Sequence, residues 1–140
     1  MNHQFIYTSL TRISDLAEME FDVEKLHREH WETGDYVVSK ILDPGSNTLN
    51  LELRTGRMRG VIGGESVVGA LGERFATLEA TGTWRKVKSD LRMNVLTGGG
   101  LMGKLTSKSV FIPNMMEVDY SGHVFRNGKK VTMNYFVGTV

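Results

Sequence analysis

Along residues 14–33 the apolar positions recur at alternating steps of three and four, which is the spacing of an amphipathic helix. The stripe consists of Leu16, Met19, Val23, Leu26 and His30. Asp15 and Glu18 stand three residues apart near its start, as in a capping box, and Gly34 suits the left-handed conformation that follows many helices. The pattern therefore predicts one N-terminal helix over about residues 14–33.

From residue 35 onward the apolar positions mostly alternate with polar ones, as in half-buried β-strands. Three such runs are Leu49-Leu51-Leu53, Leu91-Met93-Val95 and Val131-Met133-Tyr135. Asn127-Gly128 lies between strand-forming residues and predicts a two-residue hairpin turn. The expected fold is α+β and mostly β, with the N-terminal helix followed by a small antiparallel β-barrel or sandwich over about residues 35–140.

The composition predicts one globular domain over residues 1–140. The chain has 140 residues, of which 40% are hydrophobic and 24% charged, so it can bury a core but is short for two domains. No apolar run approaches the ~18–20 residues of a membrane helix, and no secretory signal is visible. The absence of cysteine excludes disulfides, thiolate metal sites and cysteine nucleophiles. We expect a cytoplasmic protein that does not bind membranes.

Charge is unevenly distributed, although the net charge is only +1. Residues 14–35 hold eight acids and two bases, whereas residues 54–108 hold ten bases and four acids. Opposed regions can steer an anionic ligand to the basic part, or let subunits of a homo-oligomer meet head to tail; an acidic helix lying on a basic sheet would explain them as well. No basic run with interleaved aromatic residues occurs, so nucleic-acid binding is not expected.

Two predicted strands start with the same pattern of glycine, acid, any residue, valine and valine. They are Gly34-Asp35-Tyr36-Val37-Val38 and Gly64-Glu65-Ser66-Val67-Val68. The glycine can adopt angles that other residues avoid, and the acid can accept backbone N–H groups across a sharp turn. The pair resembles the GD-box of cradle-loop β-barrels, although ordinary glycine-acid turns look similar. The resemblance implies a fold and no particular chemistry, because these barrels host unrelated functions.

A glycine-rich segment nearly matches a phosphate-binding loop. Gly98, Gly103 and Lys104 fit the motif, but Leu105 stands where a magnesium-binding hydroxyl belongs, and Thr106 comes one residue late. The preceding residues alternate instead of forming the continuous apolar run of a buried parallel strand, and the following ones favour extended structure over a helix. We therefore expect a connection between two strands and no nucleotide hydrolysis.

Several polar residues remain candidates for ligand binding: Arg74, Gly99, Gly100, Lys104, Thr106 and His123. The glycine N–H groups with the lysine and threonine can form an anion-binding concavity, and the arginine can bind a carboxylate or phosphate. The histidine can act as a general base if it lines a pocket. His27 and His30, with Glu24, have the spacing of a helical metal site, but further ligands are missing and no metal is expected.

Two classes of function stay open. In the first, the chain is a β-barrel-like binding or protein-interaction module that recognises a small anionic ligand or a protein partner through its loops. In the alternative, it is a small enzyme whose pocket contains Arg74, Lys104 and His123. We prefer the first class because the sequence shows no nucleophile or acid–base constellation. No cofactor is assigned.

Overall fold

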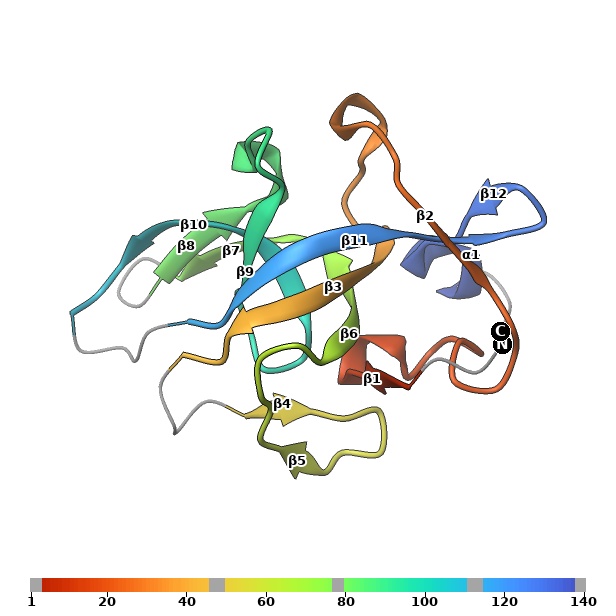
Figure 1. Ribbon diagram of the computed structural model, residues 1–140, viewed down its shortest axis with the longest axis horizontal. Coiled ribbons are helices and arrows are strands. Elements are labelled where there is room, and N and C mark those ends of the chain that lie inside the picture. The colour runs from red at the N-terminus through yellow and green to blue at the C-terminus, as the bar shows by residue number, and fades with distance from the viewer. Residues whose placement is uncertain (1–3, 46–49, 77–79, 111–114, 138–140) are drawn as a thin grey trace.

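The computed structural model describes residues 4–45, 50–76, 80–110 and 115–137. This part of the chain is mostly β-structure, arranged as one large mixed sheet and a separate two-stranded sheet (Figure 1). The strands are β1 Phe5–Tyr7, β2 Asp22–Glu24, β3 Tyr36–Asp43, β4 Leu51–Glu52, β5 Met58–Arg59, β6 Ser66–Leu71, β7 Glu73–Ala76, β8 Ala80–Thr83, β9 Arg92–Val95, β10 Leu101–Lys108, β11 Glu117–Arg126 and β12 Lys129–Lys130. The helical elements of the described residues are the 3-10 turns η1 Ser9–Thr11, η2 Arg28–His30 and η3 Trp84–Lys86, and the α-helix α1 Met133–Val137.

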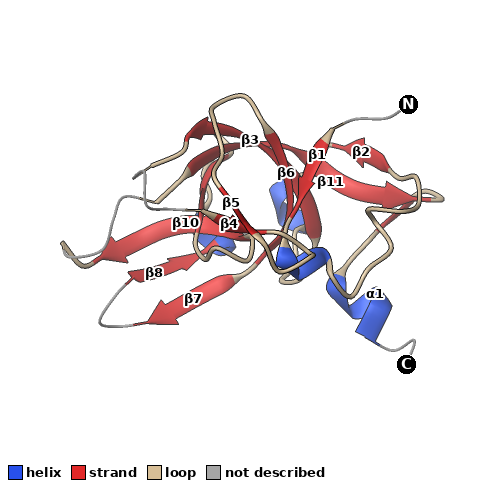
Figure 2. Ribbon diagram, turned by 90° about the horizontal axis from the view of Figure 1, so that it is seen from below, coloured by secondary structure: helices blue, strands red, loops and turns tan. Residues whose placement is uncertain are grey.

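Five strands of the large sheet pair in a closed ring, in the order β6, β3, β11, β9, β10 and back to β6. Four of these pairings are antiparallel, and the β10–β6 pairing that closes the ring is parallel. Strand β1 also pairs parallel with β6, while β2 and β12 pair with β11. Strands β8 and β7 continue from β10 as a wing, on the opposite side of the molecule from α1 (Figure 2). The sheet is therefore mixed, and the predicted antiparallel arrangement is wrong.

The side chains of the ring form an inner and an outer cluster. The inner cluster draws on all five ring strands and includes Val37, Ile41, Val67, Leu71, Met93, Val95, Met102, Val118 and Tyr120. The outer cluster uses the opposite faces of β3 and β6 and includes Leu16, Tyr36, Val38, Val68, Ala70, Val124 and Val131. Successive residues of a strand point to opposite faces, so burial of both faces explains the run of buried residues over Tyr36–Ser39.

The predicted N-terminal helix is wrong, because residues 14–33, all of them described, contain no α-helix. They form bends followed by β2 and η2. Val23 pairs with Val124 of β11, so the backbone of β2 finds its partners in a strand about a hundred residues away along the chain. Within the expected apolar stripe, Leu16 is 1% exposed but Met19 is 58% exposed. Strand pairing in the tertiary structure outweighs the modest helical propensity of the segment.

The C-terminal region contains one confirmed turn and one correction. Asn127 and Gly128 have φ values of +55° and +76° and join β11 to β12, as a type I′ hairpin requires. The predicted strand Val131-Met133-Tyr135 is wrong, because α1 begins at Met133. The N–H of Met133 donates to the carbonyl of Gly34 at 2.8 Å, which places the helix beside the start of β3.

The two glycine-acid turns have the same local structure. Gly34 and Gly64 have φ values of +92° and +96°, in the left-handed region that favours glycine. In each turn the following carboxylate accepts the N–H of the residue three positions before it, at 2.8 Å for Asp35 and 2.9 Å for Glu65. Strands β3 and β6 start directly after these acids, as the sequence predicted.

The glycine of each turn is also hydrogen-bonded to the strand that follows the other turn. The glycine N–H of the first turn donates to Leu71 at the end of β6, at 2.8 Å, and that of the second donates to Ile41 of β3, at 2.7 Å. Strands β3 and β6 pair antiparallel with Val38 opposite Val68. Equivalent residues therefore differ by 30 in number (34 and 64, 41 and 71), and the two segments are related by a local twofold arrangement.

Each core cluster holds a tyrosine whose titration reports on burial. Tyr36 of the outer cluster donates its hydroxyl proton to the carbonyl of Leu10 at 2.6 Å. Tyr120 belongs to the inner cluster. Burial, the largest contribution in both cases, raises the pKa of Tyr36 and of Tyr120 from 10.0 to about 12.

We predict that the free energy of unfolding falls as the pH rises from about 10 to about 12. In that window the unfolded chain loses its tyrosine protons while Tyr36 and Tyr120 keep theirs, so high pH favours unfolding by up to about 1.4 kcal/mol per pH unit per tyrosine. Urea unfolding at stepped pH measures the slope. Tyr36→Phe should reduce the slope, whereas Tyr135→Phe, at a residue that is 62% exposed, should not. Equal slopes for both variants would contradict the assignment.

Candidate functional site

Gly98, Gly99 and Gly100 of the glycine-rich segment form the turn between β9 and β10, and Gly103 and Lys104 lie in β10. The predicted strand connection is confirmed. Its carbonyls accept backbone N–H groups from three separate segments: from Glu52 to Gly98 at 2.7 Å, from Leu10 to Gly99 at 3.2 Å and from Ala70 to Gly100 at 3.1 Å. Gly100 has a φ of +100°, and a Cβ there would overlap the side chain of Thr8. The turn therefore joins three parts of the fold at close range, and the glycines are explained by packing.

Arg74 lies in β7 of the wing, and Lys104 and Thr106 lie in β10, to which the wing is joined. Arg74 pairs with Gly82 of β8, whereas Lys104 pairs with the next residue, Thr83. Neighbouring positions of a strand face opposite sides of the sheet, so Arg74 and Lys104 point to opposite sides. The Thr106 hydroxyl lies 2.9 Å from the hydroxyl of Thr81 in β8 and donates to the carbonyl of the same residue at 3.1 Å.

His123 is wholly buried, with a relative exposure of 0%. Its Nδ1 lies 2.6 Å from the hydroxyl of Tyr120, and its Nε2 lies 2.9 Å from Oδ2 of Asp35, which is buried as well. The Tyr120 oxygen also accepts the N–H of Leu26 at 3.0 Å. The two ring nitrogens of His123 therefore each have a buried partner, Tyr120 on one side and Asp35 on the other.

A β-bulge makes this network possible. Residues 120 and 123 would face opposite sides of a regular strand. In β11, however, Tyr120 pairs with Ser39 and Gly122 with Val38, so Ser121 is the extra residue of a bulge. The bulge brings Tyr120 and His123 to the same side of β11. Trp31 packs on both rings, with centroid distances of 4.7 and 5.6 Å.

Lys130 of β12 links the buried network to the surface. Its Nζ donates to Oδ2 of Asp35 at 3.2 Å and to Oε1 of Glu32 at 2.6 Å. Burial acts to lower the pKa of Lys130, but the hydrogen bonds and charges of Glu32 and Asp35 outweigh it and raise the pKa. The network connects β11, β12 and the first glycine-acid turn. Its position inside the core indicates a structural role for His123.

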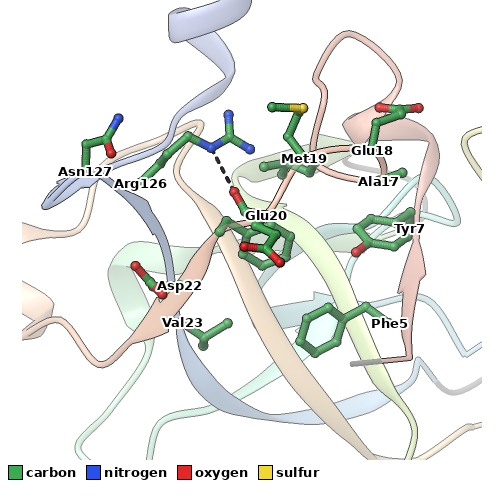
Figure 3. Close-up of a pocket in the computed structure, with 12 residues that line it drawn as sticks. Phe5, Tyr7, Ala17, Glu18, Met19, Glu20, Asp22, Val23, Arg126 and Asn127 are labelled. Carbon is green, nitrogen blue, oxygen red and sulfur yellow. Dashed lines mark hydrogen bonds between the residues drawn. The ribbon is translucent and has the colours of Figure 1, made fainter. Parts of the chain in front are cut away.

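A separate cleft of about 520 Å³ opens on the surface between β1, the bends before β2, and the β11–β12 turn (Figure 3). We call it the acidic cleft. It is lined by Phe5, Tyr7, Leu16, Ala17, Glu18, Met19, Glu20, Phe21, Asp22, Val23, Arg126 and Asn127. None of the six candidate residues from the sequence lines it.

The charges at the acidic cleft are only partly balanced. Two ion pairs lie at its edge, Arg54–Glu18 at 3.3 Å and Arg126–Asp15 at 2.8 Å. Arg126 is held further by a hydrogen bond from its Nε to the carbonyl of Glu20 at 3.1 Å (Figure 3). Across the described ranges, no ion pair engages the carboxylates of Glu20 and Asp22. The cleft therefore presents two uncompensated negative charges.

Aromatic rings form much of the rest of the lining. Phe5 and Phe21 stack with centroids 5.7 Å apart, and Phe5 meets Tyr7 edge to face at 6.4 Å. Burial is the largest influence on Tyr7 and raises its pKa despite the opposing charge of Arg54. Figure 3 shows the Tyr7 hydroxyl pointing into the cleft. The combination of aromatic rings with exposed carboxylates suits a cation.

Sequence reasoning missed this site. The sequence places the acids of residues 14–33 on a helix, whereas those that line the cleft lie in the bends before β2 and in β2, and the residues that complete the cleft come from β1 and the β11–β12 turn. The only signal in the sequence was the excess of acids itself. A second cleft, of about 610 Å³, shares Phe5 and Tyr7 with the first, but there Arg59 and Glu65 neutralise each other at 2.7 Å.

Comparison with known proteins yields no family model, curated protein or solved structure that matches this chain. The resemblance to GD-box barrels stays a prediction. Among the described residues, no helix is long and apolar enough to span a membrane. Within the same residues, no group of three histidines or acids is placed to hold a metal ion.

We predict that Gly100→Ala costs about 2–4 kcal/mol of stability, because it adds overlap with Thr8 to a left-handed backbone conformation. Gly56→Ala is the matched control, since Gly56 has a φ of +88° with no atom within 4 Å of an added Cβ, and it should cost about 1 kcal/mol. Chemical denaturation measures both. Equal losses would show that the packing of the turn does not matter.

We predict that Asp35→Asn costs about 3–5 kcal/mol, because it leaves a buried charge network without its carboxylate. Glu65→Gln, in the equivalent turn near the surface, should cost about 1 kcal/mol or less. The two variants make the same chemical change in the same type of turn, so their difference in urea unfolding isolates the contribution of burial. A loss for Asp35→Asn no larger than that for Glu65→Gln would refute the structural role of the network.

Proposed function

We propose that the protein is a binding module whose acidic cleft recognises a positively charged group, such as a lysine or arginine side chain of a partner. The observation that carries this proposal is the pair of uncompensated carboxylates, Glu20 and Asp22, in a cleft lined by aromatic rings. A cation near an aromatic face gains about 0.5–2 kcal/mol, and the carboxylates add electrostatic attraction that salt screens.

The geometry supports recognition better than catalysis. The cleft holds carboxylates, a phenol and the Arg126 guanidinium, which is already bound to Asp15. Binding a cation requires negative charge and a surface that fits it, which the carboxylates and the aromatic rings of the cleft supply. The enzyme alternative has no support from position, because Arg74 and Lys104 face opposite sides of the wing and His123 lies in the core.

The proposed ligand has the opposite charge to the one expected from the sequence. An anion site at the β9–β10 turn would use the N–H groups of Gly99 and Gly100 with Lys104, but the N–H of Gly100 already donates to the carbonyl of Thr97 at 3.1 Å and the turn is packed against Thr8. Binding of an anion there remains the competing outcome of the experiment that follows.

We predict that N-acetyl-lysine amide produces saturable shifts in the amide NMR signals of Phe21, Asp22 and Val23. N-acetyl-norleucine amide has nearly the same length without the charge, and it should produce much smaller shifts. The double variant Glu20→Gln, Asp22→Asn should weaken binding of the lysine probe about tenfold, as the loss of two surface interactions implies.

The control is Glu117→Gln with Asp119→Asn, which removes the same charge from exposed positions of β11. It should leave binding unchanged. Equal shifts with the norleucine probe would contradict charge recognition. Shifts at Gly99, Gly100 and Lys104 with inorganic phosphate, without any response to the lysine probe, would favour the anion-binding module instead.

A further inference from the structure

The connection between β8 and β9 forms a basic projection over residues 84–92, which we call the basic loop. It carries four bases and one acid: Arg85, Lys86, Lys88, Arg92 and Asp90. All of these five residues are exposed. In Figure 1 the loop projects at the top of the molecule, well away from β1, which borders the acidic cleft. The chain therefore presents a basic projection and an acidic cleft on separate surfaces.

The basic loop is held in one shape by contacts at its base. Val87 is 4% exposed and anchors the loop in the core, and its carbonyl accepts a hydrogen bond from Nη1 of Arg28 at 2.8 Å. The indole N–H of Trp84 donates to the hydroxyl of Thr33 at 2.8 Å. A rigid loop loses little conformational entropy on binding, which favours association.

Of the four bases of the loop, Lys86, Lys88 and Arg92 take part in no ion pair among the described residues. Arg85 lies over the ring of Trp84 at 4.6 Å and pairs with Glu73 at 3.6 Å. The basic loop thus presents uncompensated positive charge, and the acidic cleft presents the uncompensated negative charge of Glu20 and Asp22 on another surface.

We infer that the occupant of the acidic cleft is a second copy of this chain, whose basic loop brings Lys86 and Lys88 to Glu20 and Asp22. This inference rests on the proposed function, in which the acidic cleft binds a positively charged group, and it identifies the molecule that carries that group. Because the two surfaces differ, the contact is head to tail and repeats from copy to copy. Since the charges are exposed, the association is weak and sensitive to salt.

The test is sedimentation velocity of the whole chain over a concentration series at low ionic strength and again in about 0.3 M salt. The average mass should rise with concentration at low ionic strength and fall when salt is added. Two variants each remove one side of the contact: Glu20→Gln with Asp22→Asn, and Lys86→Gln with Lys88→Gln. Each variant alone should stay monomeric. Their equimolar mixture should form a dimer and nothing larger. One variant supplies the intact loop and the other supplies the intact cleft, so no further copy can be added.

A matched control replaces lysines outside the loop, Lys40→Gln with Lys129→Gln, both at exposed positions. It makes the same change in net charge as the variant Lys86→Gln with Lys88→Gln, and it should associate like the unaltered chain. Thermal unfolding checks that all variants are folded. The inference is overturned if the unaltered chain stays monomeric at every concentration, or if the mixture of the two variants forms no dimer.

The two proposals can fail separately. Binding of N-acetyl-lysine amide to a chain that stays monomeric would leave the proposed function standing and remove the second copy as partner. Self-association that persists in the variant Glu20→Gln, Asp22→Asn would place the contact elsewhere and overturn the inference. Loss of both lysine-probe binding and self-association in that variant, with both retained in the Lys40 and Lys129 control, would support the two together.

Discussion

The reciprocal pairing of β3 with β6 determines how the other strands of the ring are arranged. Each strand begins at a glycine-acid turn whose glycine N–H donates to a carbonyl of the other strand, at Leu71 of β6 and at Ile41 of β3, so the register is set at two points. A slip of one residue would exchange the inner and outer faces of both strands. Because β3 also pairs with β11 and β6 with β10, this register decides which side chains enter the core of the whole ring.

The two turns have the same backbone conformation, but their carboxylates have different partners. Asp35 is buried and is hydrogen-bonded to His123 and Lys130, whereas Glu65 lies near the surface and pairs with Arg59. A buried carboxylate is costly unless it is paired and hydrogen-bonded. The bulge at Ser121 therefore matters for more than the shape of β11, since it turns the histidine toward the aspartate.

The acidic cleft follows from the same tertiary pairing that prevents the N-terminal helix. When Val23 joins Val124 of β11, the residues before β2 must bend across the molecule toward β1. The bends place Glu20 and Asp22 in one cleft with Phe5 and Tyr7. On a helix, the acids of this segment would have been spread over a solvent-facing surface without the aromatic lining. The local structure of this segment and the acidic cleft are thus consequences of the pairing of β2 with β11.

Features that depend on neighbouring residues could be predicted from the amino-acid sequence. Gly34, Gly64 and Asn127-Gly128 mark turns because the required positive φ values are local, and the residues flanking the glycine-rich segment identified a strand connection. Four other features could not be predicted in this way: residues 14–33 form bends and a strand, β10 closes the ring in parallel, His123 is buried, and three separate segments build the cleft. Each of these depends on backbone partners or neighbours far away along the chain, and local propensity carries no information about them.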